Sequence, residues 1–153
     1  MPSLELKIPP PIVAAMVATA MWGISHVGPT LAIDSQIRLV VALALVAVGI
    51  TCDLLGLIAF RCSKTTINPM KPGKSSALVT TGIYNLTRNP MYLGMLALLT
   101  AWAMHLGAVW PFVGPVLFIL YINRFQIGPE EKIMQSKFGS EFADYVARVR
   151  RWL

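Results

Sequence analysis

The feature that most constrains this chain is an unbroken apolar run from Leu39 to Phe60 (residues 39–60), which holds one charged residue, Asp53. At 1.5 Å per residue, a helix over this run is roughly 33 Å long, enough to cross the hydrocarbon core of a bilayer. The composition agrees, because 56% of the 153 residues are hydrophobic and only 13% are charged. A soluble domain has about 25% charged residues and, at this size, too little interior to bury so much apolar surface. We therefore predict an integral membrane protein.

Three further apolar segments extend this to an all-α protein with about four transmembrane helices. They cover residues 12–33, 91–106 and 108–122. Gly28 and Pro29 fall inside the first segment, so we expect a bend or an early end of that helix there. The other two segments are short for independent spans and predict a tight helical hairpin.

Residues 124–153 are expected outside the membrane, as cytoplasmic amphipathic helices. Apolar side chains recur there at spacings of three and four, which is typical of a stripe along one helix face: Met134, Phe138, Phe142, Tyr145, Val149 and Trp152. Gly139 and Ser140 predict a division into two helices, with Gly139 ending one and Ser140 capping the next.

The net charge of +6 indicates orientation in the membrane rather than nucleic-acid binding, because the basic residues flank apolar runs. Most Lys and Arg residues lie in 61–89 and 124–153, whereas the short turns at 34–38 and 105–110 hold one Arg between them. The positive-inside rule then places both basic segments and both termini in the cytoplasm. We expect a bacterial inner membrane. The two cysteines lack the spacing of a metal site, and none is predicted.

Two polar clusters could carry chemistry, and the residues alone leave a structural role open for each. Asn89 followed by Pro90 is a good helix start, and Arg88 could be a positive-inside anchor. Glu130 and Glu131 could simply meet the positive end of a helix dipole.

The run G-I-Y-N-L-T-R-N-P-M-Y-L-G at 82–94 resembles a signature of the isoprenylcysteine carboxyl methyltransferase and phospholipid methyltransferase superfamily. The later run P-E-E-K-I-M-Q-S-K-F-G-S-E-F-A-D-Y-V-A-R-V-R-R-W at 129–152 resembles the C-terminal signature of that superfamily. Order and spacing fit, with a helical hairpin between the two runs. The resemblance covers about 76–153 and implies one membrane methyltransferase domain over residues 1–153.

The resemblance implies a cytoplasmic pocket for S-adenosyl-L-methionine built from segments 76–94 and 124–153. It also implies which positions bind the cofactor: Leu78, Val79, Tyr84, Arg88, Asn89, Tyr92, Gly94, Glu130 and Glu131. A glutamate can accept from the cofactor's ammonium, an arginine can hold its carboxylate, and an aromatic ring can face the sulfonium. Methyl transfer mainly needs alignment and exclusion of water, so we assign no catalytic base.

The acceptor implied is lipophilic and reaches the site from the bilayer. The prenylcysteine enzymes carry His where this chain has Asn89, and an Arg that falls at Gln126 here. Both differences disfavour a prenylcysteine carboxylate. The alternatives are a phospholipid or amine N-methyltransferase, and a non-catalytic four-helix membrane protein. The sequence leaves the atom that is methylated and the oligomeric state open.

Asp53 is a second candidate substrate residue beside Gln126. A carboxylate roughly 10 Å inside a span is costly and is a functional candidate by default. The structural alternative is an Asp that is hydrogen-bonded to a neighbouring helix, for instance near His26.

Overall fold

The computed structural model describes residues 5–63 and 77–153. Residues 64–76 lie outside the described residues. They include the lysine-rich part of segment 61–89 and the first residue of segment 76–94. The elements are α1 (Pro10–Ser25), α2 (Ser35–Cys62), η2 (Gly82–Asn85), α3 (Pro90–Leu106), η3 (Trp110–Phe112), α4 (Val113–Ile122), η4 (Asn123–Ile127) and α5 (Gly128–Arg148). The described residues form no strand, and a single isolated bridge joins Thr30 to Ala108. The all-α prediction is confirmed.

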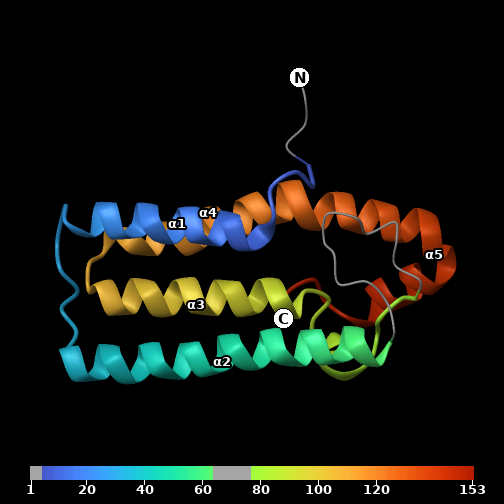
Figure 1. Ribbon diagram of the computed structural model, residues 1–153, viewed down its shortest axis with the longest axis horizontal. Helices are drawn as coiled ribbons and strands as arrows, with labels where there is room; N and C mark the ends of the chain where they lie inside the picture. The colour runs from blue at the N-terminus through green and yellow to red at the C-terminus, as the bar shows by residue number, and fades with distance from the viewer. Residues whose placement is uncertain (1–4, 64–76) are drawn as a thin grey trace.

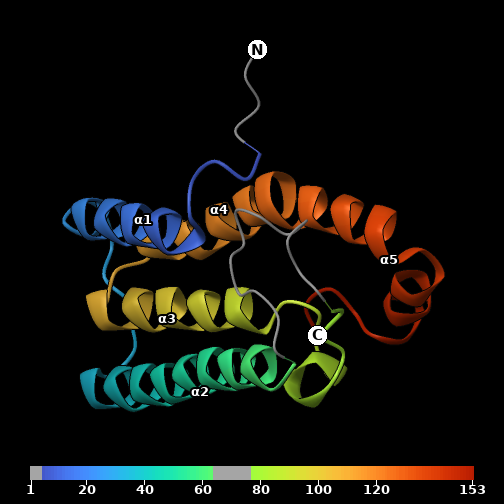
Figure 2. The ribbon, with the colours of Figure 1, turned by 45° about the vertical axis from the view of Figure 1, so that its right-hand side comes forward.

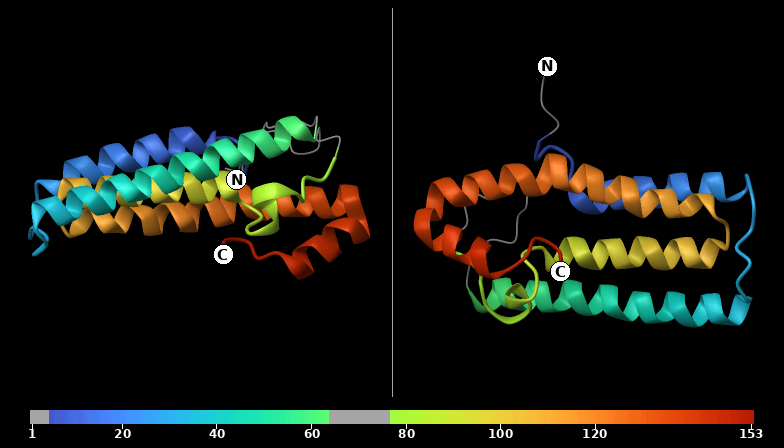
Figure 3. Two further views of the ribbon diagram at one scale, coloured as in Figure 1. Left: turned by 90° about the horizontal axis from the view of Figure 1, so that it is seen from below. Right: turned by 180° about the vertical axis from the view of Figure 1, so that it is seen from behind.

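The four helices α1 to α4 lie side by side along the long axis of the molecule (Figure 1). The chain reverses direction at each turn, so that α2 packs along α3 while α1 packs against α4. The turns after α1 and α3 share one end of the bundle, and α5 and η2 lie at the other end (Figure 3).

One described helix, α2, is long and apolar enough by length and composition to cross a membrane. Its N-terminus is capped by Asp34, whose carboxylate accepts from the backbone N–H of Gln36 at 2.8 Å. The helices α1 and α3 are apolar but have 16 and 17 residues. The prediction of about four spans therefore stays a prediction, while membrane character and helical class agree with the structure.

The helix within expected span 12–33 is shorter than the span. It ends at Ser25, and the chain then passes through Gly28, whose φ of 104° lies in the left-handed region. Gly28 and Pro29 cannot continue the helix, as the sequence indicated. Within 108–122, the first turn is the 3₁₀ turn η3, and α4 begins only at Val113.

The helix pair α2 and α3 is in close contact because two glycines face each other. A Cβ on Gly94 would lie 2.8 Å from the Gly49 carbonyl oxygen and would collide with the Asp53 carboxylate. Gly94 therefore serves helix packing at this point, and it brings Asp53 against the backbone of α3.

The helix α4 runs directly into the π-helical turn η4 and then into α5, which bends at Gly139 (φ 50°, ψ −120°). The expected division at Gly139 is confirmed, because only glycine adopts this backbone conformation at no steric cost. The bend turns the second half of α5 back toward the start of α3 (Figure 2).

Candidate functional site

The starts of α3 and α5 are joined by a hydrogen bond between two predicted site residues. The Tyr92 hydroxyl donates to Glu130 Oε1 at 2.6 Å, and the Tyr92 side chain is buried. Burial raises the pKa of Glu130 to about 7; the hydrogen bond from Tyr92 lowers it in part and the nearby Glu131 raises it further. Glu130 thus lies close to the midpoint of its titration at neutral pH.

The neighbouring carboxylate, Glu131, is held by two guanidinium groups. Arg88 Nη2 lies 2.8 Å from Glu131 Oε1, and Arg151 donates from Nε at 3.1 Å and from Nη2 at 2.5 Å. Two cations with one anion leave a surplus positive charge. The Arg88 side chain is only 10% exposed, and its Nε is buried without a hydrogen-bond partner among the described residues. This nitrogen is free to donate to a bound anion.

The last residues of the chain lie across the start of α3. The backbone N–H of Arg88 donates to the Arg150 carbonyl at 3.0 Å. The Arg151 carbonyl accepts from Asn89 Nδ2 at 2.9 Å and from Thr87 Oγ1 at 3.2 Å. Asn89 occupies the N-cap position but makes no side-chain cap, so its side chain holds the C-terminal tail instead of the helix start. The expected helix start is confirmed, with Asn89 at the N-cap position and Pro90 at the start of α3.

Thr87 and Arg151 were not among the predicted site residues, although both lie within the two motif runs. Thr87 is fully buried, and Arg151 completes the charge cluster. The basic run Arg148-Val149-Arg150-Arg151 lies near the end of the second motif run and was the available signal for Arg151.

An apolar and aromatic wall adjoins the charged cluster. It contains Val79, Tyr84, Phe142, Tyr145 and Val149, with Leu78 packed against it. The Tyr145 hydroxyl donates to the Tyr84 carbonyl at 2.7 Å, and Phe60 meets the Tyr84 ring edge-on at 5.5 Å. Burial raises the pKa of Tyr84, and Tyr145 and Glu130 raise it further, so the phenol stays protonated and lies near Glu130.

Asp53 lies on α2 and faces α3 at Gly94, and no hydrogen bond joins it to this cluster among the described residues. It packs against Gly94, and its Oδ1 is buried without a hydrogen-bond partner among the described residues. The suggested pairing with His26 was wrong: His26 follows α1, meets Trp22 at 5.2 Å and precedes the start of α2, whereas Asp53 lies about 27 Å further along α2.

Gln126 is fully buried in the π-helical turn η4. Its Nε2 donates to the Ile8 carbonyl at 2.7 Å, and its Oε1 has no partner among the residues described. Gln126 therefore contacts the N-terminal segment rather than the Arg88–Glu131 cluster. Single π-helical turns inside α-helices occur frequently at functional sites.

Together these features define a helical membrane protein with a charged, partly buried cluster at one end of its apolar helices. Residues 37–141 match the family model described as phospholipid methyltransferase, and the chain belongs to this family. The matched residues include the first motif and the start of the second. A protein from Haemophilus influenzae that is described as uncharacterised is 49% identical over 63 residues, which are 41% of this chain and all of that protein. No solved structure matches. The resemblance seen in the sequence is thus confirmed at the level of the family.

Proposed function

We propose that this protein transfers a methyl group from S-adenosyl-L-methionine to a lipophilic acceptor that partitions into the membrane. One observation carries the proposal. Glu130, hydrogen-bonded to Tyr92, is the sequence neighbour of Glu131, around which Arg88 and Arg151 leave a surplus positive charge. Both motifs contribute residues to this cluster, and the cluster lies at the start of an apolar helix.

The contacts favour different roles for the two glutamates. S-adenosyl-L-methionine carries an ammonium and a carboxylate on the same carbon. Glu131 already accepts from Arg88 and Arg151, so Glu130 is the carboxylate available to the ammonium. Arg88, with its unpartnered Nε, and Arg151 supply the positive charge for the cofactor's carboxylate.

The apolar wall supplies the surface for the uncharged part of the cofactor. Leu78, Val79 and Tyr84 belong to this wall, and Tyr84 lies near Glu130. Asn89 acts indirectly in this proposal, because it ties the tail that carries Arg151 to the start of α3. Gly94 acts through the close α2–α3 contact.

The cofactor supplies a methyl carbon already activated by its sulfonium. With the cofactor held by Glu130, Arg88 and Arg151, a lone pair of the acceptor would form the new bond to this carbon as the carbon–sulfur bond breaks, and the bonding electron pair would stay on sulfur. The products would be the methylated acceptor and S-adenosylhomocysteine, and an acceptor that attacks through an O–H or N–H group would release its proton after transfer. The protein's part is to align the partners and exclude water.

A lipophilic acceptor is supported by the outer surface of the bundle. Large apolar side chains such as Leu43, Ile50 and Leu120 are exposed on it, as expected for helices surrounded by lipid. An acceptor that keeps its chain in hydrocarbon avoids a cost of about 0.8 kcal/mol per CH₂ for extraction into water. The description of the matching family favours a second candidate, N-methylation of a phospholipid amine.

The proposed topology has four spans, formed by α1 to α4, in a single domain of the bacterial inner membrane. The backbone N–H of Leu6 donates to the Phe125 carbonyl, and that of Arg88 donates to the Arg150 carbonyl, so Leu6 and Arg150 lie at the same end of the bundle. The basic residues favour the cytoplasm for that side.

Calorimetry with S-adenosylhomocysteine on purified protein tests the cofactor site. We expect Glu130→Gln to lose about ten- to a hundredfold in affinity, as for a lost hydrogen bond to a charged group. Glu141→Gln changes an exposed glutamate on the same helix and should bind like the native chain. Absence of binding to the native protein would reject the enzyme and favour a non-catalytic membrane protein.

A further inference from the structure

The arginine proposed to hold the cofactor's carboxylate is enclosed in this structure. The Arg88 side chain is 10% exposed, its Nε is buried, and its neighbour Thr87 is fully buried. A molecule of the size of S-adenosyl-L-methionine therefore reaches Arg88 Nε only if a segment that covers it moves. The contacts of Arg88 identify this segment.

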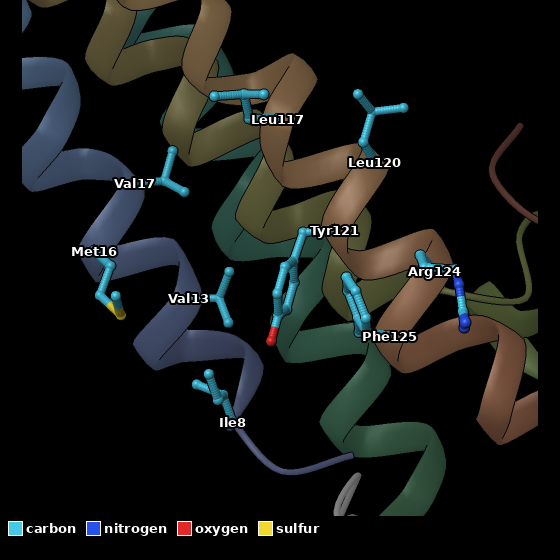
Figure 4. Close-up of a pocket in the computed structure, with 9 residues that line it drawn as sticks. All are labelled: Ile8, Val13, Met16, Val17, Leu117, Leu120, Tyr121, Arg124 and Phe125. Atoms are coloured by element: carbon cyan, nitrogen blue, oxygen red, sulfur yellow. The ribbon is translucent and has the colours of Figure 1, made fainter. Parts of the chain in front are cut away.

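The apolar groove between α1 and α4 does not lead to Arg88. Figure 4 shows this groove, with Val13 and Val17 of α1 facing Leu117 and Leu120 of α4. Neither Arg88 nor Glu130 is among the residues that line it. The path to the charged cluster therefore lies elsewhere.

Arg88 is covered by the end of α5 and the residues that follow it. Its backbone N–H donates to the Arg150 carbonyl at 3.0 Å, and its Nη1 donates to the Val146 carbonyl at 3.4 Å. Its Nη2 donates to Glu131, which also accepts from Arg151. The segment that must move to admit a ligand is therefore found among these covering residues.

The covering residues after α5 have no helical backbone. The helix ends just before Val149, which is buried in the apolar wall and has an extended backbone (φ −121°, ψ 130°). We call residues 150–152 the strap. Its backbone is tied to the start of α3 at Arg151, whose carbonyl accepts from Asn89 and Thr87. Segments held by few contacts outside regular elements open locally at the lowest free energy.

Trp152 anchors the strap on a second element. Its indole Nε1 donates to Asn123 Oδ1 at 3.2 Å, and its ring packs against the buried core that contains Tyr92. Asn123 is the first residue of the π-helical turn η4. Trp152 thus acts on the charged cluster through its neighbour Arg151, whose guanidinium it holds against Glu131.

The other elements around the cluster are held by more extensive packing. Tyr84 is buried, meets Phe60 of α2 edge-on, and accepts at its carbonyl from Tyr145. The start of α3 is fixed to α2 by the close contact of Gly49 with Gly94. Movement there would separate packed helices, whereas release of the strap leaves every helix in place.

A bound cofactor would favour the closed strap. Arg151 belongs both to the strap and to the proposed carboxylate site, and its side chain is 40% exposed. With the strap open, the cofactor's carboxylate would keep Arg88 but lose Arg151. A ligand shifts an equilibrium toward the arrangement that it binds better, so the cofactor should hold the strap shut.

We propose that the strap opens to admit the cofactor and closes over it, and that Trp152 and Asn123 are positioning residues that set how readily it opens. The identity of the ligand rests on the function proposed above. The opening itself does not, because it is measured on the protein without ligand.

Hydrogen exchange at the Arg88 amide reports the opening, because this N–H is bonded to the Arg150 carbonyl. The measurement uses the full-length protein in nanodiscs, resolved to single amides by mass spectrometry. The Leu93 amide, bonded to the Asn89 carbonyl within the start of α3, is the internal reference. We expect Arg88 to exchange faster than Leu93. S-adenosylhomocysteine at about 100 times its Kd should slow Arg88 exchange by up to roughly a hundredfold.

Trp152→Phe keeps an aromatic ring and removes the indole N–H that is bonded to Asn123. Loss of one neutral hydrogen bond should speed Arg88 exchange about three- to tenfold, and Asn123→Ala should do the same. The double variant should add little to either change, because both remove the same bond. Rate constants for S-adenosylhomocysteine should rise for association as well as dissociation, since the strap is the route of entry and exit.

Trp102→Phe is the matched control. Trp102 packs against the same buried core as Trp152 and donates its indole N–H to the Ala18 carbonyl at 3.1 Å. This variant loses an equivalent hydrogen bond far from the strap. It should leave the ratio of Arg88 to Leu93 exchange unchanged.

Equal effects of Trp152→Phe and Trp102→Phe, or equal exchange of Arg88 and Leu93 in the native chain, would overturn the opening strap. Faster dissociation without faster association in Trp152→Phe would overturn the strap as the entry route. Calorimetry with S-adenosylhomocysteine separates the two proposals. Faster Arg88 exchange in Trp152→Phe without cofactor binding to the native chain supports the opening strap and rejects the methyltransferase function. Cofactor binding with rates that Trp152→Phe leaves unchanged does the reverse.

Discussion

The Tyr92 hydroxyl donates to Glu130 across 2.6 Å and joins two motifs that are 38 residues apart in the chain. The bond places an ionisable carboxylate against the buried start of α3, and burial raises the pKa of Glu130 to about 7. Binding of a cationic ligand and the protonation of this one residue are therefore coupled.

Cofactor affinity should depend on pH through Glu130. An ammonium binds the ionised carboxylate, so the affinity for S-adenosylhomocysteine should rise between pH 6 and pH 8, with about a tenfold loss one unit below the pKa. Calorimetry across this range measures the change. In Glu130→Gln the curve should be flat, and an equal slope in both proteins would show that another group is responsible.

The stability of the protein without ligand should show the opposite trend. The folded chain keeps the Glu130 proton up to about pH 7, whereas an unfolded chain loses it near the ordinary value of 4.5. The stabilising contribution is therefore complete below about pH 4.5 and is lost as the pH rises toward 7. Over this window the unfolding free energy of the native chain should fall relative to that of Glu130→Gln, which does not titrate, as measured by denaturant titration in detergent; a constant difference would contradict the assignment.

Glu131→Gln should mainly destabilise the fold. The change leaves Arg88, which is nine-tenths buried, beside Arg151 without a counterion, at a cost of roughly 1.5–3 kcal/mol for hydrogen bonds to a charged group. The control is Glu5→Gln, which breaks the exposed pair with Arg124 and should cost at most about 1 kcal/mol. If both variants unfold at the same denaturant concentration, the cluster has no special structural role.

Gly94→Ala should destabilise the α2–α3 contact. The added methyl collides with the Asp53 carboxylate and lies 2.8 Å from the Gly49 carbonyl oxygen, and overpacking of this kind costs about 1–3 kcal/mol. Combining it with Asp53→Ala removes one of the two clashes, so unfolding measurements should show partial recovery. If the double variant loses more unfolding free energy than the two single variants together, Asp53 has a separate structural role.

Both termini should be cytoplasmic. A reporter that is active only outside the cytoplasm should be silent when it is fused after Leu153 and active when it replaces the chain after Gly107, at the far end of the bundle. Activity after Leu153 would overturn the orientation and, with it, the cytoplasmic cofactor site.

The sequence by itself determined the local structure and the family. An apolar run without breaks dictates a long helix, because each backbone group bonds within the helix, and α2 covers all of residues 39–60. The division of the C-terminal segment at Gly139 was equally readable, since the required backbone conformation depends on one residue. The two motifs were sufficient to identify the family.

Only the tertiary structure decided which of these side chains meet. Glu130 and Glu131 are neighbours with the same chemistry, yet one contacts Tyr92 and the other two arginines. Asp53 faces Gly94 rather than His26 because two glycines let α2 and α3 approach closely. Such contacts depend on how helices pack across dozens of residues of chain, and helical periodicity specifies the face of a residue but not the partner that covers it.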